Sequence, residues 1–136
     1  MQELLNICAT LLDNADLDIS VEIFTSKVTL DFVVGGSLEK IIIYCKNYQR
    51  LRIIKSHDEE QCFFVGKTEI ESVYSKSKLQ ELLKEDGWLY HDKTEFTPMF
   101  WVRCEGAITL DIVCSRLEWR IDGSQSKVVP IPDLVE

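Results

Sequence analysis

The sequence predicts an α+β fold, in which a mainly antiparallel meander sheet of about seven or eight strands is packed by two helices. Three observations lead to this fold class. Two segments carry apolar stripes at three- and four-residue spacing, most of the remaining chain alternates apolar with polar residues, and turn-like residues separate the alternating segments. A chain of 136 residues has the size of one ordinary domain. We expect residues 1–122 to form a single α+β domain and residues 123–136 to form an extended C-terminal arm.

The two helices are expected at residues 2–13 and near residues 75–86. One apolar stripe marks the first helix, made of Leu4, Leu5, Ile7, Cys8, Leu11 and Leu12. In the second, Ser75 is suited to cap the N-terminus and Gly87 to follow the C-terminus. Residues 68–73 suit either a strand or the lead-in to this helix, and the sequence does not separate the two.

Between the helices, alternating apolar residues predict strands joined by short turns. The turns are expected at residues 26–27, 35–36 and 47–49, with a further strand at residues 61–65. These turns set the registers: Ile23 opposite Leu30, Asp31 opposite Lys40, and Tyr44 opposite Arg52. Glu22, Asp31 and Lys40 would then form a ladder of charges across three strands.

The last third of the chain predicts a meander, with turns at residues 105–106 and 115–116. The expected registers place Trp101 opposite Leu110, Ile112 opposite Trp119, and Asp111 opposite Arg120. Alternate apolar residues of the last two strands then share one face, which supports the register: Ile108, Leu110, Ile112, Cys114, Leu117, Trp119 and Ile121. The tail contains Pro130 and Pro132, which exclude a central strand and favour an extended arm over the domain or over a second copy.

The net charge of −8 and the isoelectric point near 4.8 make direct nucleic-acid binding unlikely, because phosphate-backbone binders present a basic surface. The charge is uneven, however. Residues 40–55 contain five basic residues and no acidic one. Such a segment in an acidic chain can mark a docking surface, although a run of charges is more often a solvated face.

This basic segment supplies the candidate binding site. Seven residues are expected on one face of two paired strands, namely Lys40, Ile42, Tyr44, Lys46, Arg50, Arg52 and Ile54. A helix could cover the isoleucines and leave the cations at its rim, as is usual for an α+β sheet. Alternatively, the face stays open and docks an acidic protein partner or a second copy of the chain as a homodimer.

No catalytic, metal or cofactor signature is present, so the sequence predicts neither a catalytic residue nor a cofactor. The dipeptides His57-Asp58 and His91-Asp92 lack a fixed set of ligands, and the five cysteines show no zinc spacing. Reduced, mostly buried thiols, an acidic N-terminus and no membrane-length apolar run together indicate a cytoplasmic protein without a membrane segment. Cys104 is the thiol expected to be most exposed, because it lies beside a turn.

Two hypotheses of function follow. The first is a non-enzymatic protein–protein interaction module, of adaptor, chaperone-like or inhibitor type, that acts through a sheet face or edge. The alternative is a small-ligand-binding protein or enzyme with a pocket between the curved sheet and the helices, lined by Trp88, Trp101 and Trp119. A third, weaker hypothesis is an acidic mimic of nucleic acid.

Overall fold

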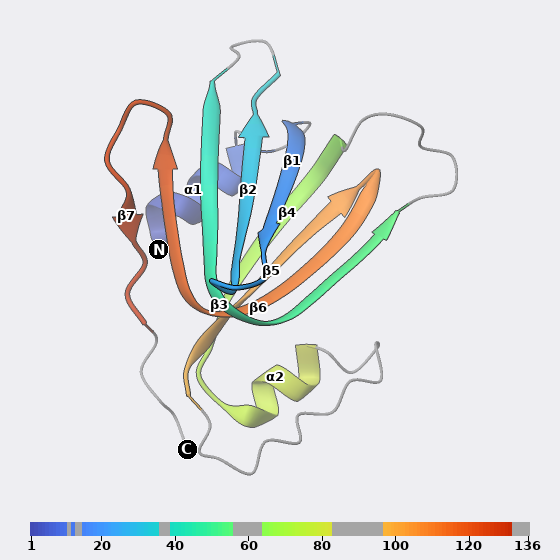
Figure 1. The fold of residues 1–136 in the computed structure, drawn as a ribbon, viewed down its shortest axis with the longest axis vertical. Coiled ribbons are helices and arrows are strands. Elements are labelled where there is room, and N and C mark those ends of the chain that lie inside the picture. Colours follow the sequence, from blue (N-terminus) through green and yellow to red (C-terminus); the bar gives the residue numbers. More distant parts are fainter. Residues whose placement is uncertain (11, 13–14, 36–38, 56–63, 83–96, 132–136) are drawn as a thin grey trace.

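The computed structural model describes residues 1–10, 12, 15–35, 39–55, 64–82 and 97–131. In this part of the chain, seven strands form one antiparallel sheet and two helices pack on it (Figure 1). The predicted fold class is therefore confirmed. Neither of these two helices is long and apolar enough to cross a membrane.

The elements follow one another along the chain as α1 (Gln2–Thr10), β1 (Ala15–Glu22), β2 (Lys27–Val33), β3 (Lys40–Lys55), β4 (Phe64–Val73), α2 (Lys76–Leu82), β5 (Met99–Gly106), β6 (Ile108–Ile121) and β7 (Lys127–Val128). Their order in the sheet is β3-β2-β1-β4-β5-β6-β7, and β3 also pairs with β6. This additional pairing closes the sheet on itself.

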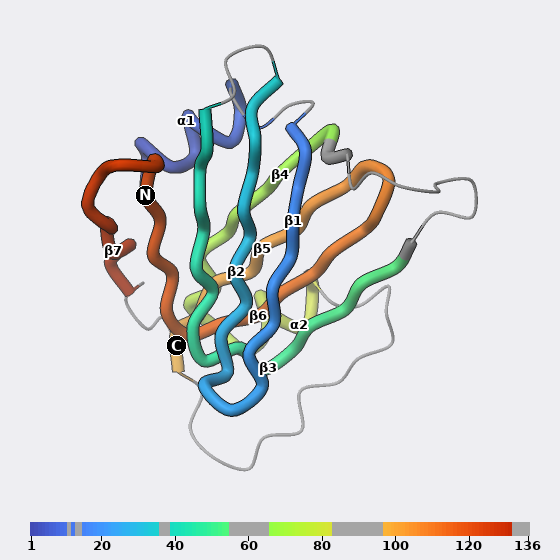
Figure 2. Tube along the Cα trace, turned by 45° about the horizontal axis from the view of Figure 1, so that its top comes forward, coloured from blue at the N-terminus to red at the C-terminus, as the bar shows by residue number. Residues whose placement is uncertain are grey.

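The closure depends on two long strands. β3 and β6 are paired from Ile41 and Ile121 at one end to Lys55 and Ile108 at the other. Both strands bend together, as the two views show (Figure 1, Figure 2). On one side of the bend they continue the sheet of β1 and β2, and on the other they continue the sheet of β5 and β4. Corners of this kind are made by strands that pass from one sheet layer to another through bends or bulges.

The bend has an identifiable local cause. Asn47 has a φ of 54°, in the left-handed region that asparagine tolerates better than most residues. Beyond it, β3 contains a bulge, because Tyr48 lies opposite Cys114 whereas Arg50 lies opposite Val113. An extra residue on one strand bends it and increases its twist.

The inner face of the closed sheet holds the main core, to which α1 contributes Leu4, Ile7 and Cys8. The strands contribute most of the rest, including the fully buried side chains of Phe32 and Ile43. A second, smaller cluster lies on the outer face beneath α2 and consists of Val73, Leu79, Met99, Trp101 and Val113. Val73, Met99 and Trp101 therefore pack on the opposite side of the sheet from the main core, whereas Phe100 between the last two belongs to the main core.

Several predicted elements are confirmed with changed bounds. α1 ends at Thr10 rather than at residue 13, because β1 already begins at Ala15. The Ser75 hydroxyl accepts a hydrogen bond from the backbone N–H of Lys78 at 3.2 Å, as expected of an N-cap. α2 is described as far as Leu82, so the predicted end near Gly87 lies outside the described residues. Residues 68–73 belong to β4, which decides the open alternative in favour of a strand.

Two predicted turns are wrong. Residues 47–49 and 115–116 do not reverse the chain, because each lies inside a continuous strand, β3 or β6. Tyr44 therefore pairs with Glu118, and Arg52 pairs with Asp111, instead of with each other. The local sequence at both positions is compatible with a turn, but the pairing of the two strands along their whole length keeps both of them extended.

The other predicted registers are also shifted. Leu30 faces Ile19 rather than Ile23, because four residues, 23–26, form the turn between β1 and β2. The turn between β2 and β3 is closed by a hydrogen bond from the Val34 N–H to the Glu39 carbonyl, and Asp31 faces Ile42. The predicted ladder of Glu22, Asp31 and Lys40 is consequently absent from the structure.

The register of the C-terminal meander differs as well, because the turn between β5 and β6 is longer than predicted. Trp101 faces Val113 rather than Leu110, because three residues separate the last pair, Glu105 and Thr109. Asp111 lies opposite Arg103 and not Arg120. The apolar residues expected to share one face between Ile108 and Trp119 nevertheless do so, since they belong to the main core cluster.

Candidate functional site

The seven residues of the predicted binding site share the outer side of β3, but the bend divides them into two groups. Their inward neighbours Ile43, Cys45 and Leu51 pack in or against the main core, which leaves the alternate residues facing outward. The first group is Lys40, Ile42, Tyr44 and Lys46, and the second is Arg50, Arg52 and Ile54.

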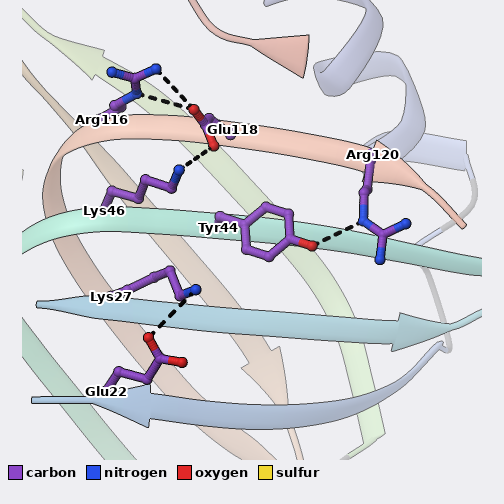
Figure 3. A network of polar contacts seen from close by, with 7 residues as sticks. All are labelled: Glu22, Lys27, Tyr44, Lys46, Arg116, Glu118 and Arg120. Carbon is purple, nitrogen blue, oxygen red and sulfur yellow. Dashed lines mark hydrogen bonds and ion pairs between the residues drawn. The ribbon is translucent and has the colours of Figure 1, made fainter. Parts of the chain in front are cut away.

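The first group is occupied by contacts within the molecule (Figure 3). The Tyr44 hydroxyl accepts a hydrogen bond from Arg120 Nε at 2.9 Å. Lys46 Nζ lies 2.6 Å from Glu118 Oε2, and Arg116 contacts the other oxygen of the same carboxylate at 3.0 Å. These contacts join β3 to β6. They favour the interpretation of this group as a solvated face, whose charges are neutralised by other side chains of the same molecule.

Glu118 is the centre of this network. It is only 8% exposed, and the hydrogen bond from Lys46 is the largest factor that holds the pKa of its carboxyl below the ordinary value. Arg116 lowers the pKa further, whereas burial opposes the shift. Glu22 and Lys27 form a separate ion pair of 3.4 Å on β1 and β2, and the Lys27 ammonium lies 5.7 Å from the centre of the Tyr44 ring.

The two isoleucines that suggested an apolar docking surface differ in exposure. Ile42 is 7% exposed and lies in register between Asp31 and Arg120. Ile54 is 45% exposed near the end of β3. Only Ile54 therefore offers apolar surface to a partner.

The second group lies beside a buried carboxylate that the sequence did not indicate. Arg52 is the register partner of Asp111 on β6, and Asp111 is in turn the register partner of Arg103 on β5. The row of side chains on the outer face thus reads Arg52, Asp111, Arg103 across three strands. We call the set Arg50, Arg52, Ile54, Arg103 and Asp111 the arginine face.

Contacts within the arginine face centre on Asp111, which is 1% exposed. Arg103 Nη1 donates to Asp111 Oδ1 at 3.2 Å, and Arg103 Nε donates to Glu105 Oε1 at 2.7 Å. The second oxygen of Asp111 is buried without a hydrogen-bond partner. Asp111 therefore lies beside three guanidinium groups, and one of them, that of Arg103, also contacts Glu105.

The electrostatic environment of the arginines is consistent with this crowding. Partial burial and the nearby charge of Arg52 lower the pKa of Arg50, while Asp111 opposes the shift. Burial also acts to lower the pKa of Arg103, but the hydrogen bond to Glu105 and the charge of Asp111 outweigh it and raise the value. Arg50 and Arg103 remain charged at neutral pH despite these shifts, because the guanidinium group does not lose its proton in proteins.

Such a group of arginines can bind anions. The planar guanidinium group binds carboxylates through two parallel hydrogen bonds, and arginines at alternate positions of one strand present two such groups side by side. No group of three or more histidine, cysteine, aspartate or glutamate side chains in the described ranges could hold a metal ion.

The tryptophans do not line a shared pocket as far as they are described. Trp101 packs in the outer cluster beneath α2, whereas Trp119 packs in the main core. The two rings are on opposite faces of the sheet. The predicted register, which placed both of them beside the same strand on one face, is therefore wrong. Trp88 lies outside the described residues.

The cysteines offer no reactive thiol in the described part of the chain. Cys8, Cys45, Cys104 and Cys114 are free and buried. Burial raises the pKa of Cys104 to about 12, so the expectation that this thiol is exposed is wrong. A depression between α1 and β4 is bordered by Cys8, whose pKa burial also raises to about 12. A thiol that stays protonated at neutral pH is a poor nucleophile.

Sequence reasoning missed two features of the surface. Arg103 was not recognised, because its position beside Asp111 depends on the three-residue spacing of the β5–β6 turn. Ile23 was expected in a strand, but it is 76% exposed in the β1–β2 turn, next to the fully exposed Phe24. A signal for this turn was present in the sequence. Glu22 and Lys27 carry opposite charges on either side of the turn, and they pair with each other.

The sequence matches no protein-family model and no curated protein.

Proposed function

We propose that this chain is a non-enzymatic protein–protein interaction module, of adaptor, chaperone-like or inhibitor type, that docks an acidic partner on the arginine face. The observation that carries the proposal is the row formed by Arg52, Asp111 and Arg103, with Arg50 beside it. It supports docking because three arginines gather at one place in a chain whose net charge is −8.

The position of Ile54 also supports docking. Its half-exposed side chain continues the outer face beyond Arg52, so that apolar surface adjoins the cations. Arginine is enriched at the centres of interfaces, where it combines charge with apolar contact area. The first group of the predicted site contributes less, because Tyr44 and Lys46 are already engaged by side chains of β6.

The test is a pull-down in which the double variant Arg50→Ala with Arg52→Ala is compared with the unmodified chain. We expect the variant to lose the captured partner and the unmodified chain to release it as salt is raised, because charges at an interface rim are screened. A double variant that still binds every partner of the unmodified chain would contradict the proposal.

A matched control removes the same amount of charge elsewhere. Arg116→Ala with Lys127→Ala changes the net charge equally, and both side chains lie outside the arginine face, in ion pairs with Glu118 and Glu3. We expect this control to retain the partner. Loss of binding in both double variants would attribute the effect to net charge and not to the arginine face.

A further inference from the structure

The second half of β3 has one edge that no described strand covers. Residues 48–55 pair with β6 on one side, whereas β2 pairs only with residues 40–46. Within the described ranges, the other side of residues 48–55 has no strand neighbour. Its first residue is held by the β1–β2 turn, since the Tyr48 N–H donates to the Ser26 carbonyl at 3.1 Å.

An edge of this kind presents a row of backbone N–H and C=O groups that can pair with another extended chain. In the sheet, side chains alternate between the two faces along the edge. Arg50, Arg52 and Ile54 lie on the outer side, and Leu51 and Ile53 lie on the inner side, where Leu51 packs against the main core. Ile53 faces Leu110 in register yet remains 46% exposed.

We propose that the acidic partner binds by adding a strand to this edge, with acidic side chains on the outer side and apolar side chains on the inner side. The inference rests on the proposed function and specifies its geometry and the sequence pattern of the partner. Acidic residues at every second position would meet Arg50 and Arg52, and the apolar residues between them would cover Leu51 and Ile53. Backbone hydrogen bonds supply affinity in this mode, and the alternating side chains supply specificity.

Charge argues against a second copy of the chain as the occupant. In an antiparallel pairing of this edge with itself about Leu51, Arg50 of one copy would face Arg52 of the other. Like charges directly opposite each other on paired strands are destabilising. Charged residues on an edge are one means by which proteins prevent association between identical edges. The same arginines would attract a strand of opposite charge.

The experiment measures the binding of short synthetic peptides in which glutamate alternates with valine. Three forms are compared: an unmodified peptide and two peptides in which every second backbone amide is N-methylated, in one phase or the other. A strand bound at an edge uses the amides of only one of its sides. We expect one methylated phase to bind on the order of tenfold more weakly or worse, because several hydrogen bonds are lost, and the other phase to bind like the unmodified peptide.

Two protein variants separate this inference from the proposed function. Arg50→Ala with Arg52→Ala should weaken the unmodified peptide, whereas Arg116→Ala with Lys127→Ala should not. If both methylated phases bind as well as the unmodified peptide while the arginine variant loses binding, strand addition is overturned and the docking function stands. If the arginine variant binds all peptides normally, both proposals are overturned.

Amide hydrogen exchange gives a second readout on the whole chain. Addition of the unmodified peptide should slow exchange at alternate residues between 49 and 55. The N-methylated peptide that binds weakly should leave the exchange rates unchanged. Protection of these amides before any peptide is added would show that the edge is already occupied by the chain itself or by a second copy, and it would overturn the inference. Sedimentation of the free protein separates these two occupants.

Discussion

Trp119 and Phe24 are two large aromatic residues in opposite environments. Trp119 is 3% exposed in the main core, and the Lys127 ammonium lies 4.9 Å from the centre of its ring. Phe24 is fully exposed in the β1–β2 turn. The contribution of each ring to stability follows from the apolar area that folding removes from water.

We expect Trp119→Ala to destabilise the protein by about 3–5 kcal/mol, through lost burial and the cavity left behind. Phe24→Ala is the control and should change the free energy of unfolding by less than about 0.5 kcal/mol. Chemical denaturation of both variants measures the two values. A loss below about 1 kcal/mol for Trp119→Ala would mean that the ring is not part of the core.

Glu118 is a single residue whose contribution to the free energy of unfolding depends on pH. Its pKa is lowered in the folded protein, first by the hydrogen bond from Lys46, so its ionised form stabilises the fold. This contribution is complete above the ordinary carboxyl value of 4.5 and is lost as the pH falls through the lowered folded value.

The stability difference between the unmodified chain and Glu118→Gln should therefore be constant near neutral pH and shrink below about pH 4.5. Denaturation at a series of pH values measures this difference. Glu81→Gln, at an exposed position of α2, is the control for the removal of one carboxylate. A difference that grows on acidification would contradict the assignment.

At the scale of elements, β3 shows what local sequence can and cannot predict. The alternation of Ile41, Ile43 and Cys45 identified a strand with the correct inward face. Asn47 was interpreted as part of a turn, because asparagine is typical of turns and of left-handed backbone. The residue does have a positive φ, but this conformation bends β3 instead of reversing it.

The same reasoning failed at Ser115 and Arg116 of β6 for a non-local reason. In both strands, the inward side changes by one residue at the level where they lie opposite each other, from Cys45 to Tyr48 and from Cys114 to Leu117. A turn would interrupt the alternation of inward and outward residues in the same way, so the sequence pattern alone resembles that of a turn. Only the mutual pairing of the two strands distinguishes a shared bend from two hairpins, and that pairing cannot be derived from either segment alone.

The candidate site was predictable to the same extent. Arg50, Arg52 and Ile54 were correctly placed on one side of a strand, since this depends only on the two-residue period. Their neighbours were not predictable, because Asp111 and Arg103 come from strands whose registers depend on the bend and on the β5–β6 turn. Tyr44 and Lys46 were assigned to the same patch only because of the wrong turn at residues 47–49.

The bend leads to a prediction for Asn47. A β-branched residue at a φ of 54° is strained, so Asn47→Val should cost about 1–2 kcal/mol. Asn47→Gly is the matched control, because glycine adopts this conformation without strain, and it should be close to neutral. Thermal or chemical denaturation compares the two variants, and equal stabilities would show that the left-handed backbone is not what bends β3.

At the scale of the whole molecule, the C-terminal segment joins the sheet to the first helix. Lys127 and Val128 pair with Trp119 and Glu118, and Val129 is 2% exposed. The Lys127 ammonium also contacts the Glu3 carboxylate at 2.9 Å. Residues 127–129 thus pair with β6 of their own chain after a turn at residues 122–124, and residues 132–136 are outside the described range.

We expect deletion of residues 126–136 to lower the free energy of unfolding, because it uncovers the side of β6 that Val129 covers. Val129→Ala should reproduce part of the loss, about 1 kcal/mol, through the removal of buried methyl groups. Ile131→Ala, at an exposed position, is the control. Unchanged stability after the deletion would show that the tail is not part of the folded unit.

The pairing of β3 with β6 also affects how fast this protein can fold. It joins Ile41 to Ile121 and Lys55 to Ile108, so segments from the first half of the chain must meet segments near its end. Long-range contacts of this kind raise the contact order, because a large loop is closed before the contact contributes any stability. Refolding should therefore take milliseconds to seconds, as in other proteins dominated by non-local strand pairing. Since β3 and β6 run through both layers, neither layer has its full set of strands until these two meet, and the two layers should form in a single kinetic step.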